Sequence, residues 1–142
     1  MSTESNKKLV ERLFSEVIAG KNPAAIDQLI SPKFAHHGIP NEQPGVAGFV
    51  ETLKNFQTAF PDLQVHAQQF VAEGEEVATR GYMTGTNKGE FMGMPATNKQ
   101  VRFDYIDWWK FENGKAIENW VQLDMPAMMA QLGVQPGGAQ AR

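Results

Sequence analysis

The amino-acid sequence predicts an α+β domain in which helices pack on one face of a curved, mostly antiparallel sheet. Apolar residues recur at helical spacing over roughly the first 60 residues, and they alternate with polar residues after Pro61. Helices followed by strands are typical of a helix layer that covers one side of an antiparallel sheet. The length of 142 residues fits one hydrophobic core. We therefore expect a single domain over residues 1–134.

Three helices are expected before the strands. An amphipathic stripe that ends at Gly20 predicts the first helix. Asn22 suits the N-cap of a second, short helix, and Pro23 suits its first helical position. Pro44 opens a longer third helix, which Pro61 ends. The expected helices cover residues 4–19, 22–30 and 44–60.

Four strands and a last helix are expected after Pro61. Glu73-Gly74 and Asn113-Gly114 have the composition of tight hairpin turns, whereas residues 34–45 and 87–99 are rich in Gly, Pro and Asn and are expected to be loops. The strands are expected at residues 63–71, 77–86, 101–111 and 116–124, the last helix at 126–132 and a disordered tail at 135–142.

Composition narrows the classes of function. Apolar residues make up 42% of the chain and charged residues 20%, as in soluble globular proteins. The net charge of −3 comes without a basic cluster, which argues against a nucleic-acid partner. No apolar run reaches membrane-spanning length and no signal-peptide pattern is present, so we expect a cytoplasmic protein without a membrane partner. Without cysteine, and with three scattered histidines, no metal site and no cofactor are expected.

The last hairpin predicts which side chains share a face. A two-residue turn at Asn113-Gly114 would pair Trp109 with Glu118 and Asp107 with Trp120. The same register would place an acid, Asp124, opposite Phe103. One face would then collect the aromatic and polar residues Phe103, Tyr105, Asp107, Trp109, Glu118, Trp120, Gln122 and Asp124.

Both faces of this hairpin depart from a simple pattern of core and solvent. We interpret the aromatic and polar face as the lining of a cavity for a small, mostly apolar molecule, which a few polar groups orient. The opposite face would expose a second apolar cluster on a monomer, so we expect a homodimer through it. The residues of that cluster are Ile106, Trp108, Val121 and Leu123.

The C-terminal half of the chain resembles the SnoaL-like polyketide cyclase family. The segment "RGYMTGTNKGEFMGMPATNK" is similar to the family's glycine-rich loop, "DWWKFENGKAIENWVQLD" to its hairpin and "AMMAQLG" to its ending. Upstream, "HHG" and "AFPDL" also fit. The resemblance covers about residues 7–134 and implies a cone-shaped α+β barrel with a central cavity. Asn87 and Asn98 stand where the family's loop usually has His and Gly.

The resemblance also implies a chemistry. In characterised cyclases of this family a strand-end aspartate is the general acid/base of an intramolecular aldol ring closure, without metal or cofactor, and that motif falls on Asp124. The family fold also serves isomerases, hydrolases and proteins that only bind a ligand. An aspartate just before Met125-Pro126 would equally be the N-cap of the last helix.

Further candidates have structural alternatives. Asp107 is either a second catalytic carboxylate or a buried acid that orients Trp120 or Arg80. Arg80 is either exposed or the partner of such a carboxylate. The motif match makes His37 a residue of the cavity mouth. The remaining expected substrate-binding residues could equally be core: Tyr82, Tyr105, Trp109, Trp120 and Gln122.

Overall fold

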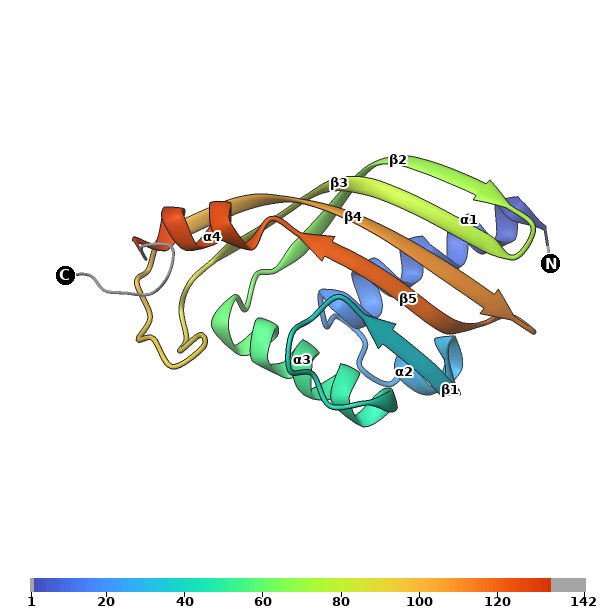
Figure 1. The fold of residues 1–142 in the computed structure, drawn as a ribbon, viewed down its shortest axis with the longest axis horizontal. Coiled ribbons are helices and arrows are strands. Elements are labelled where there is room, and N and C mark those ends of the chain that lie inside the picture. The colour runs from blue at the N-terminus through green and yellow to red at the C-terminus, as the bar shows by residue number, and fades with distance from the viewer. Residues whose placement is uncertain (1, 134–142) are drawn as a thin grey trace.

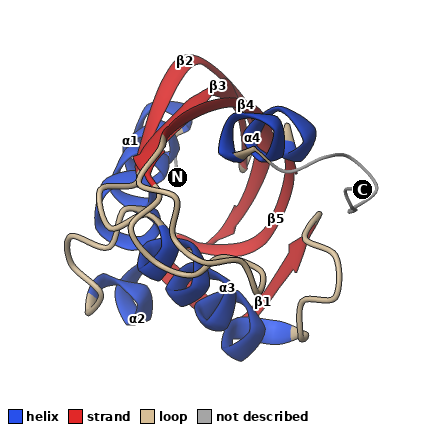
Figure 2. Cartoon of the chain, turned by 90° about the vertical axis from the view of Figure 1, so that its left-hand side faces the viewer, coloured by secondary structure: helices blue, strands red, loops and turns tan. Residues whose placement is uncertain are grey.

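The computed structural model describes residues 2–133, and the tail expected at 135–142 lies outside them. It confirms the α+β class, with N-terminal helices, a curved mixed sheet of five strands and a short C-terminal helix. Figure 2 shows the sheet curving around α1 and α3, and Figure 1 shows α4 at the end of the sheet away from the N-terminus. The helices are α1 (Thr3–Arg12), the π-helix η1 (Leu13–Ile18), α2 (Ala25–Leu29), α3 (Gly45–Ala59) and α4 (Met125–Leu132).

The sheet has the strand order β1-β5-β4-β3-β2, so β1 and β2 are its edges (Figure 1). All neighbouring strands are antiparallel except β1 and β5, which are parallel. Within residues 2–133, no helix combines the length and apolar character needed to cross a bilayer. The strands are β1 (Ile30–His37), β2 (Gln64–Glu73), β3 (Glu76–Thr86), β4 (Gln100–Glu112) and β5 (Lys115–Leu123).

The first strand corrects the expectation of a loop that begins at Phe34. Residues 30–37 form β1 at the sheet edge, where Pro32 is tolerated because its missing N–H breaks no bond inside the sheet. A register shift between Ile30 and Ala35 accommodates this irregular segment. The strand brings His36 and His37 beside β5, with which they pair at Asn119 and Trp120.

The last hairpin has the expected turn but a different register. Asn113 and Gly114 both have positive φ angles, 52° and 78°, as a two-residue hairpin turn requires. Phe111 pairs with Ala116, as the two-residue turn requires, but Lys110 then pairs with Glu118, so that Ile117 is an extra residue in β5. Because side chains alternate along a strand, this bulge turns the rest of β5 over.

The corrected register changes which residues face inward. Asp107 pairs with Val121 rather than Trp120, and Trp109 pairs with Asn119 rather than Glu118. The inner face of β4 is as expected and is buried, with exposed fractions between 1% and 5% for Phe103, Tyr105, Asp107, Trp109 and Phe111. On β5, however, Asn119, Val121 and Leu123 face inward, and Glu118, Trp120 and Gln122 do not.

Candidate functional site

An apolar chamber lies between the concave face of the sheet and α3. It has a volume of about 60 Å³, and its polar side chains come from three strands and one helix. These are His36 on β1, Asp107 on β4, Asn119 on β5 and Thr52 on α3. The rest of the wall is aliphatic and aromatic: Phe14, Ile18, Ile39, Phe49, Leu53, Phe56, Leu63, Met83, Trp109, Val121 and Leu123.

The chamber continues into a wider vestibule of about 680 Å³. The two spaces share Ile39, Thr52, Phe56 and Leu123 as lining residues. Methionines line the vestibule beside these residues, and Met92 is 67% exposed. Flexible thioether side chains adapt to apolar ligands of different outline. The vestibule therefore offers an entrance with apolar and polar walls to the small apolar chamber.

Asp107 is the carboxylate of the chamber. It is 5% exposed, and its two oxygens accept hydrogen bonds from the Thr79 hydroxyl at 2.6 Å and from the Trp109 indole Nε1 at 2.9 Å. Thr79 also bonds the hydroxyl of Tyr105 at 2.8 Å. Burial raises the pKa of Asp107 to about 7, although the hydrogen bonds from Thr79 and Trp109 act in the opposite direction. The carboxyl group therefore changes its charge near neutral pH.

The same network affects Tyr105. Its ring is buried and packs edge-on against Phe14, with ring centroids 5.9 Å apart. Burial raises the pKa of Tyr105 to about 12, and the nearby Asp107 adds to that rise. The phenol therefore stays protonated across the physiological range and supplies a fixed hydroxyl to Thr79.

Asn119 is a site residue that the sequence prediction missed. It is 2% exposed, and its amide nitrogen donates to the main-chain oxygen of Trp108 at 3.0 Å. This bond fixes the amide group and leaves Oδ1 without a hydrogen-bond partner among the described residues. Oδ1 is not among their fully buried atoms. Asn119 therefore offers the chamber an acceptor. The register expected from the sequence places Asn119 on the opposite face of the sheet.

Asp124 lies at the expected strand end but not in the chamber. It is exposed, and its carboxylate accepts a hydrogen bond of 3.1 Å from the backbone N–H of Ala127, which makes it the N-cap of α4. Neither the chamber nor the vestibule has Asp124 among its lining residues. Of the two roles weighed for this residue, the structure shows the cap.

Most of the other expected substrate-binding residues lie on the convex face of the sheet. Arg80 donates to Gln69 at 2.8 Å and makes no bond to Asp107. Tyr82 is stacked between Arg102 and the ring of His66. Trp120 is 40% exposed and stacks on His37, with ring centroids 5.4 Å apart. Gln122 is exposed at the vestibule edge, whereas Tyr105 and Trp109 do face inward.

The two asparagines that differ from the usual family loop have structural roles. Asn87 is buried, and its side chain bonds Ala59, Gly89 and Thr97 at 2.8–3.3 Å, which holds the loop that follows β3. Asn98 has a φ of 61°, a left-handed conformation that glycine adopts without strain and asparagine tolerates. Neither residue lines the chamber.

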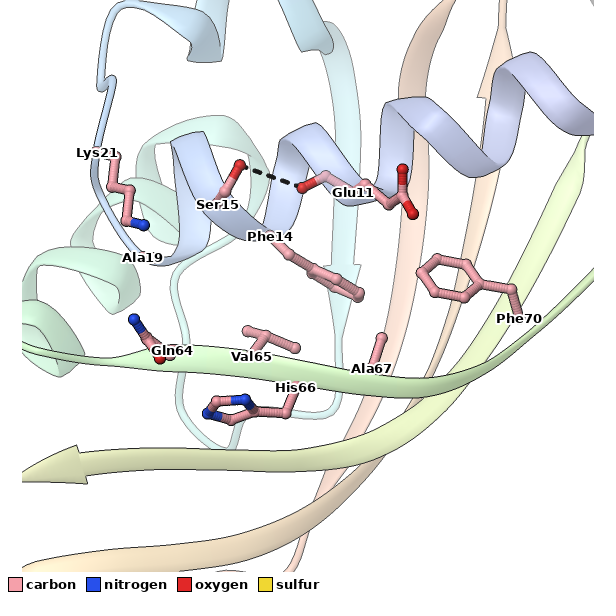
Figure 3. Close-up of a pocket in the computed structure, with 10 residues that line it drawn as sticks. All are labelled: Glu11, Phe14, Ser15, Ala19, Lys21, Gln64, Val65, His66, Ala67 and Phe70. Carbon is pink, nitrogen blue, oxygen red and sulfur yellow. Dashed lines mark hydrogen bonds between the residues drawn. The ribbon is translucent and has the colours of Figure 1, made fainter.

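A separate pocket of about 310 Å³ lies between the first helix and the edge strand β2 (Figure 3). The rings of Phe14 and Phe70 approach each other across it, and Ser15 donates to the carbonyl of Glu11 at 3.3 Å. Its charged residues, Glu11 and Lys21, are exposed. Phe14 lines both spaces and separates this pocket from the chamber that holds Asp107.

Several solved structures are similar to this chain over nearly its whole length. AclR, a proposed hydroxylase from Streptomyces galilaeus, is 30% identical over 95% of this chain and 100% of its own, with a TM-score of 0.84. IdmH, a proposed polyketide cyclase from Streptomyces antibioticus, is 28% identical over 91% and 99%, with a TM-score of 0.77. A proposed polyketide cyclase from Acidithiobacillus ferrooxidans is 27% identical over 94% and 98%, with a TM-score of 0.81.

The comparison with curated proteins gives no match. The family model described as SnoaL-like polyketide cyclase matches residues 8–132, nearly the whole described chain. This match agrees with the resemblance seen in the loop, hairpin and C-terminal segments of the sequence. The chain belongs to the SnoaL-like polyketide cyclase family.

Proposed function

We propose that the protein is a cofactor-independent enzyme that moves a proton on a small, mostly apolar carbonyl compound, with Asp107 as the general base. The observation that carries this proposal is a buried carboxylate in an apolar chamber, with a pKa raised to about 7. A base of this strength is half ionised near neutral pH and is strong enough to remove a proton next to a carbonyl. Aldol-type cyclisation, isomerisation and hydrolysis would all use such a group.

The surroundings of Asp107 support this role. Thr79 and Trp109 each donate to one oxygen, so the carboxylate is held in one orientation while its remaining lone pairs stay free to accept a proton. The apolar wall removes water that would otherwise solvate the ionised group. The vestibule accommodates the rest of a ligand that is larger than the chamber.

The test uses a probe whose reaction needs only a base. Ring opening of 5-nitrobenzisoxazole starts with removal of the proton on carbon 3, breaks the N–O bond and releases a coloured cyanophenolate. We expect turnover by the full chain to rise with pH through about 7 and to fall by 10² to 10⁴-fold in Asp107→Asn. Turnover that is absent from the wild-type chain, or unchanged in Asp107→Asn, contradicts the proposal.

The main alternative is a binding module without catalysis, a use to which the same fold is also put. The small apolar chamber beside a larger vestibule favours ligand retention as well as chemistry. Asp107→Asn separates the two functions. It should bind a neutral apolar probe such as N-phenyl-1-naphthylamine as tightly as the wild type, whichever function the protein has. Only an enzyme loses turnover in that variant.

We further propose that a second copy of the chain covers the convex face of the sheet. Val71, Trp108 and Trp120 lie in one row across the strands, with exposed fractions of 58%, 48% and 40%. Ile106 beside them is 62% exposed. Exposed apolar side chains gathered in this way are typical of an interface. Val121 and Leu123, which the sequence placed in this interface, line the chamber instead.

A further inference from the structure

Two adjacent histidines on β1 have matched partners on opposite faces of the sheet. Nδ1 of His36 lies 2.8 Å and 3.0 Å from the two carboxylate oxygens of Glu42, and both side chains are at least 93% buried. Nε2 of His37 lies 2.7 Å from Glu118, and these two side chains are 44% and 30% exposed. His36 and Glu42 are thus a buried pair, in which His36 lines the chamber and Glu42 lines the vestibule.

The ring of His36 is held in a fixed orientation. Phe49 packs edge-on against it, with ring centroids 4.7 Å apart, and Phe34 stacks on it at 6.0 Å. An ionised carboxylate only accepts hydrogen bonds, so a hydrogen bond to ionised Glu42 requires a proton on Nδ1. The contact with Glu42 and the packing of the two phenylalanine rings together fix the orientation of the imidazole.

The second ring nitrogen of His36 is unused. Nε2 has no hydrogen-bond partner among the described residues, and it is not one of their fully buried polar atoms. His36 lines the same chamber as Asp107. A histidine that has one nitrogen fixed by a buried carboxylate and the other directed to open space is arranged for proton transfer.

The register places His36 and Asp107 on the inner face two strands apart. His36 pairs with Asn119 on β5, and Asp107 pairs with Val121, two residues further along the same strand. Strand spacing and rise per residue then put their Cα atoms about 12 Å apart along the sheet, and side chains directed inward shorten that distance. Both side chains line the same chamber, which is where a substrate would meet the two groups.

We propose that His36 is a second catalytic residue, which donates a proton from Nε2 to the substrate oxygen while Asp107 takes a proton from carbon, and that Glu42 is its positioning residue. This inference rests on the proposed function. In enolisation the C–H electron pair becomes the C=C bond, and the carbonyl electrons move to oxygen. Oxygen takes the imidazolium proton, which leaves neutral imidazole, the enol and protonated Asp107. The buried Glu42 carboxylate compensates the charge of the imidazolium before transfer.

The test compares leaving groups in the benzisoxazole reaction. His36→Gln should lower turnover of unsubstituted benzisoxazole about 100-fold, because its more basic phenolate oxygen then leaves without a proton. With 5-nitrobenzisoxazole, whose phenolate leaves readily unprotonated, the loss should shrink to within about threefold. A variant that merely damaged the fold would lower both rates equally. The matched controls, His37→Gln and Glu118→Gln, should leave both rates unchanged.

Glu42→Gln gives a second, milder variant, because glutamine keeps a hydrogen-bonding oxygen but loses the charge. It should reduce turnover of unsubstituted benzisoxazole about tenfold and show the same dependence on the leaving group. If His36→Gln and Glu42→Gln both turn over unsubstituted benzisoxazole like the wild type while Asp107→Asn does not, the inference is wrong and the proposed function stands. If Asp107→Asn is also unchanged, the proposed function fails with it.

Discussion

Asp107 and Thr79 face each other across β4 and β3, and the Thr79 hydroxyl donates a hydrogen bond of 2.6 Å to the carboxylate. The hydroxyl also bonds Tyr105, so a short chain of oxygens leads from the chamber carboxylate into the core. A hydroxyl donates and accepts, and Thr79 can therefore reverse its bonds when Asp107 becomes protonated. The carboxyl group keeps its partners in both charge states.

The buried charge of Asp107 should make stability depend on pH. The pKa in the folded chain is raised to about 7, from an ordinary value near 3.8, so between these values the folded state holds a proton that the unfolded state releases. The free energy of unfolding therefore falls as pH rises from 4 through 7. Asp107→Asn removes this dependence and should be more stable than the wild type by up to about 4 kcal/mol at pH 8.

Urea unfolding at pH 4 and pH 8 measures this difference. The gap between the two proteins should close at pH 4, where the wild-type carboxyl is protonated in the folded chain. Asp62→Asn is the control, because the Asp62 carboxylate bonds Thr86 on the outside of the cone and its pKa is lowered. Equal stability of wild type and Asp107→Asn at pH 8 would contradict the assignment.

Thr79→Val should raise the pKa of Asp107 further. The Thr79 hydrogen bond favours the ionised carboxylate, and valine has nearly the same shape but no donor. The rise of probe turnover with pH should move upward by about one unit. Thr84→Val, on the convex side of the same strand where the hydroxyl bonds His66, should leave the profile in place. An unmoved profile in Thr79→Val would show that this bond does not tune the base.

Asp124 should matter for stability and not for turnover. Replacing an N-cap by alanine costs about 1 kcal/mol, and asparagine, which also caps, should restore most of that loss. Thermal unfolding of Asp124→Ala and Asp124→Asn measures the cap, and the benzisoxazole assay measures the chemistry. A loss of turnover in the well-folded Asp124→Asn would return the acid/base role to the strand end.

The convex face should control association. Trp108→Lys and Ile106→Lys each place a charge among the exposed apolar side chains of the convex face and should shift sedimentation from dimer to monomer. Met92→Lys is the control, since Met92 is more exposed than either residue but lies at the vestibule, away from the convex face. Wild-type protein that sediments as a monomer at tens of micromolar contradicts the interface.

The sequence supports the elements better than it supports the site. Helical spacing, proline stops and the Asn113-Gly114 turn are local signals, and the structure confirms the fold class and the elements that depend on them. The bulge at Ile117 has no such signal, because both faces of β5 carry apolar and polar residues and either register looks acceptable. That one residue moved Trp120 and Gln122 outward and brought Asn119 inward.

The sequence pattern also does not predict which segments pair when they are distant along the chain. His36 and His37 looked like loop residues because Ser31-Pro32 ended the preceding helix, and only the parallel pairing with β5 makes that segment a strand. Strand alternation then separates the two histidines, so that the inner one meets Glu42 and the outer one Glu118. Asp107, by contrast, was on the expected face because it depended on β4 alone.

A ¹³C NMR titration of the Asp107 carboxyl carbon in the full chain tests the central claim most directly, with the resonance assigned by its absence in Asp107→Asn. The chamber geometry predicts a titration midpoint of about 7, which Thr79→Val moves upward. A midpoint near 4, the ordinary value for an aspartate in water, would show that the carboxyl group is solvated and would contradict its role as a base poised at neutral pH.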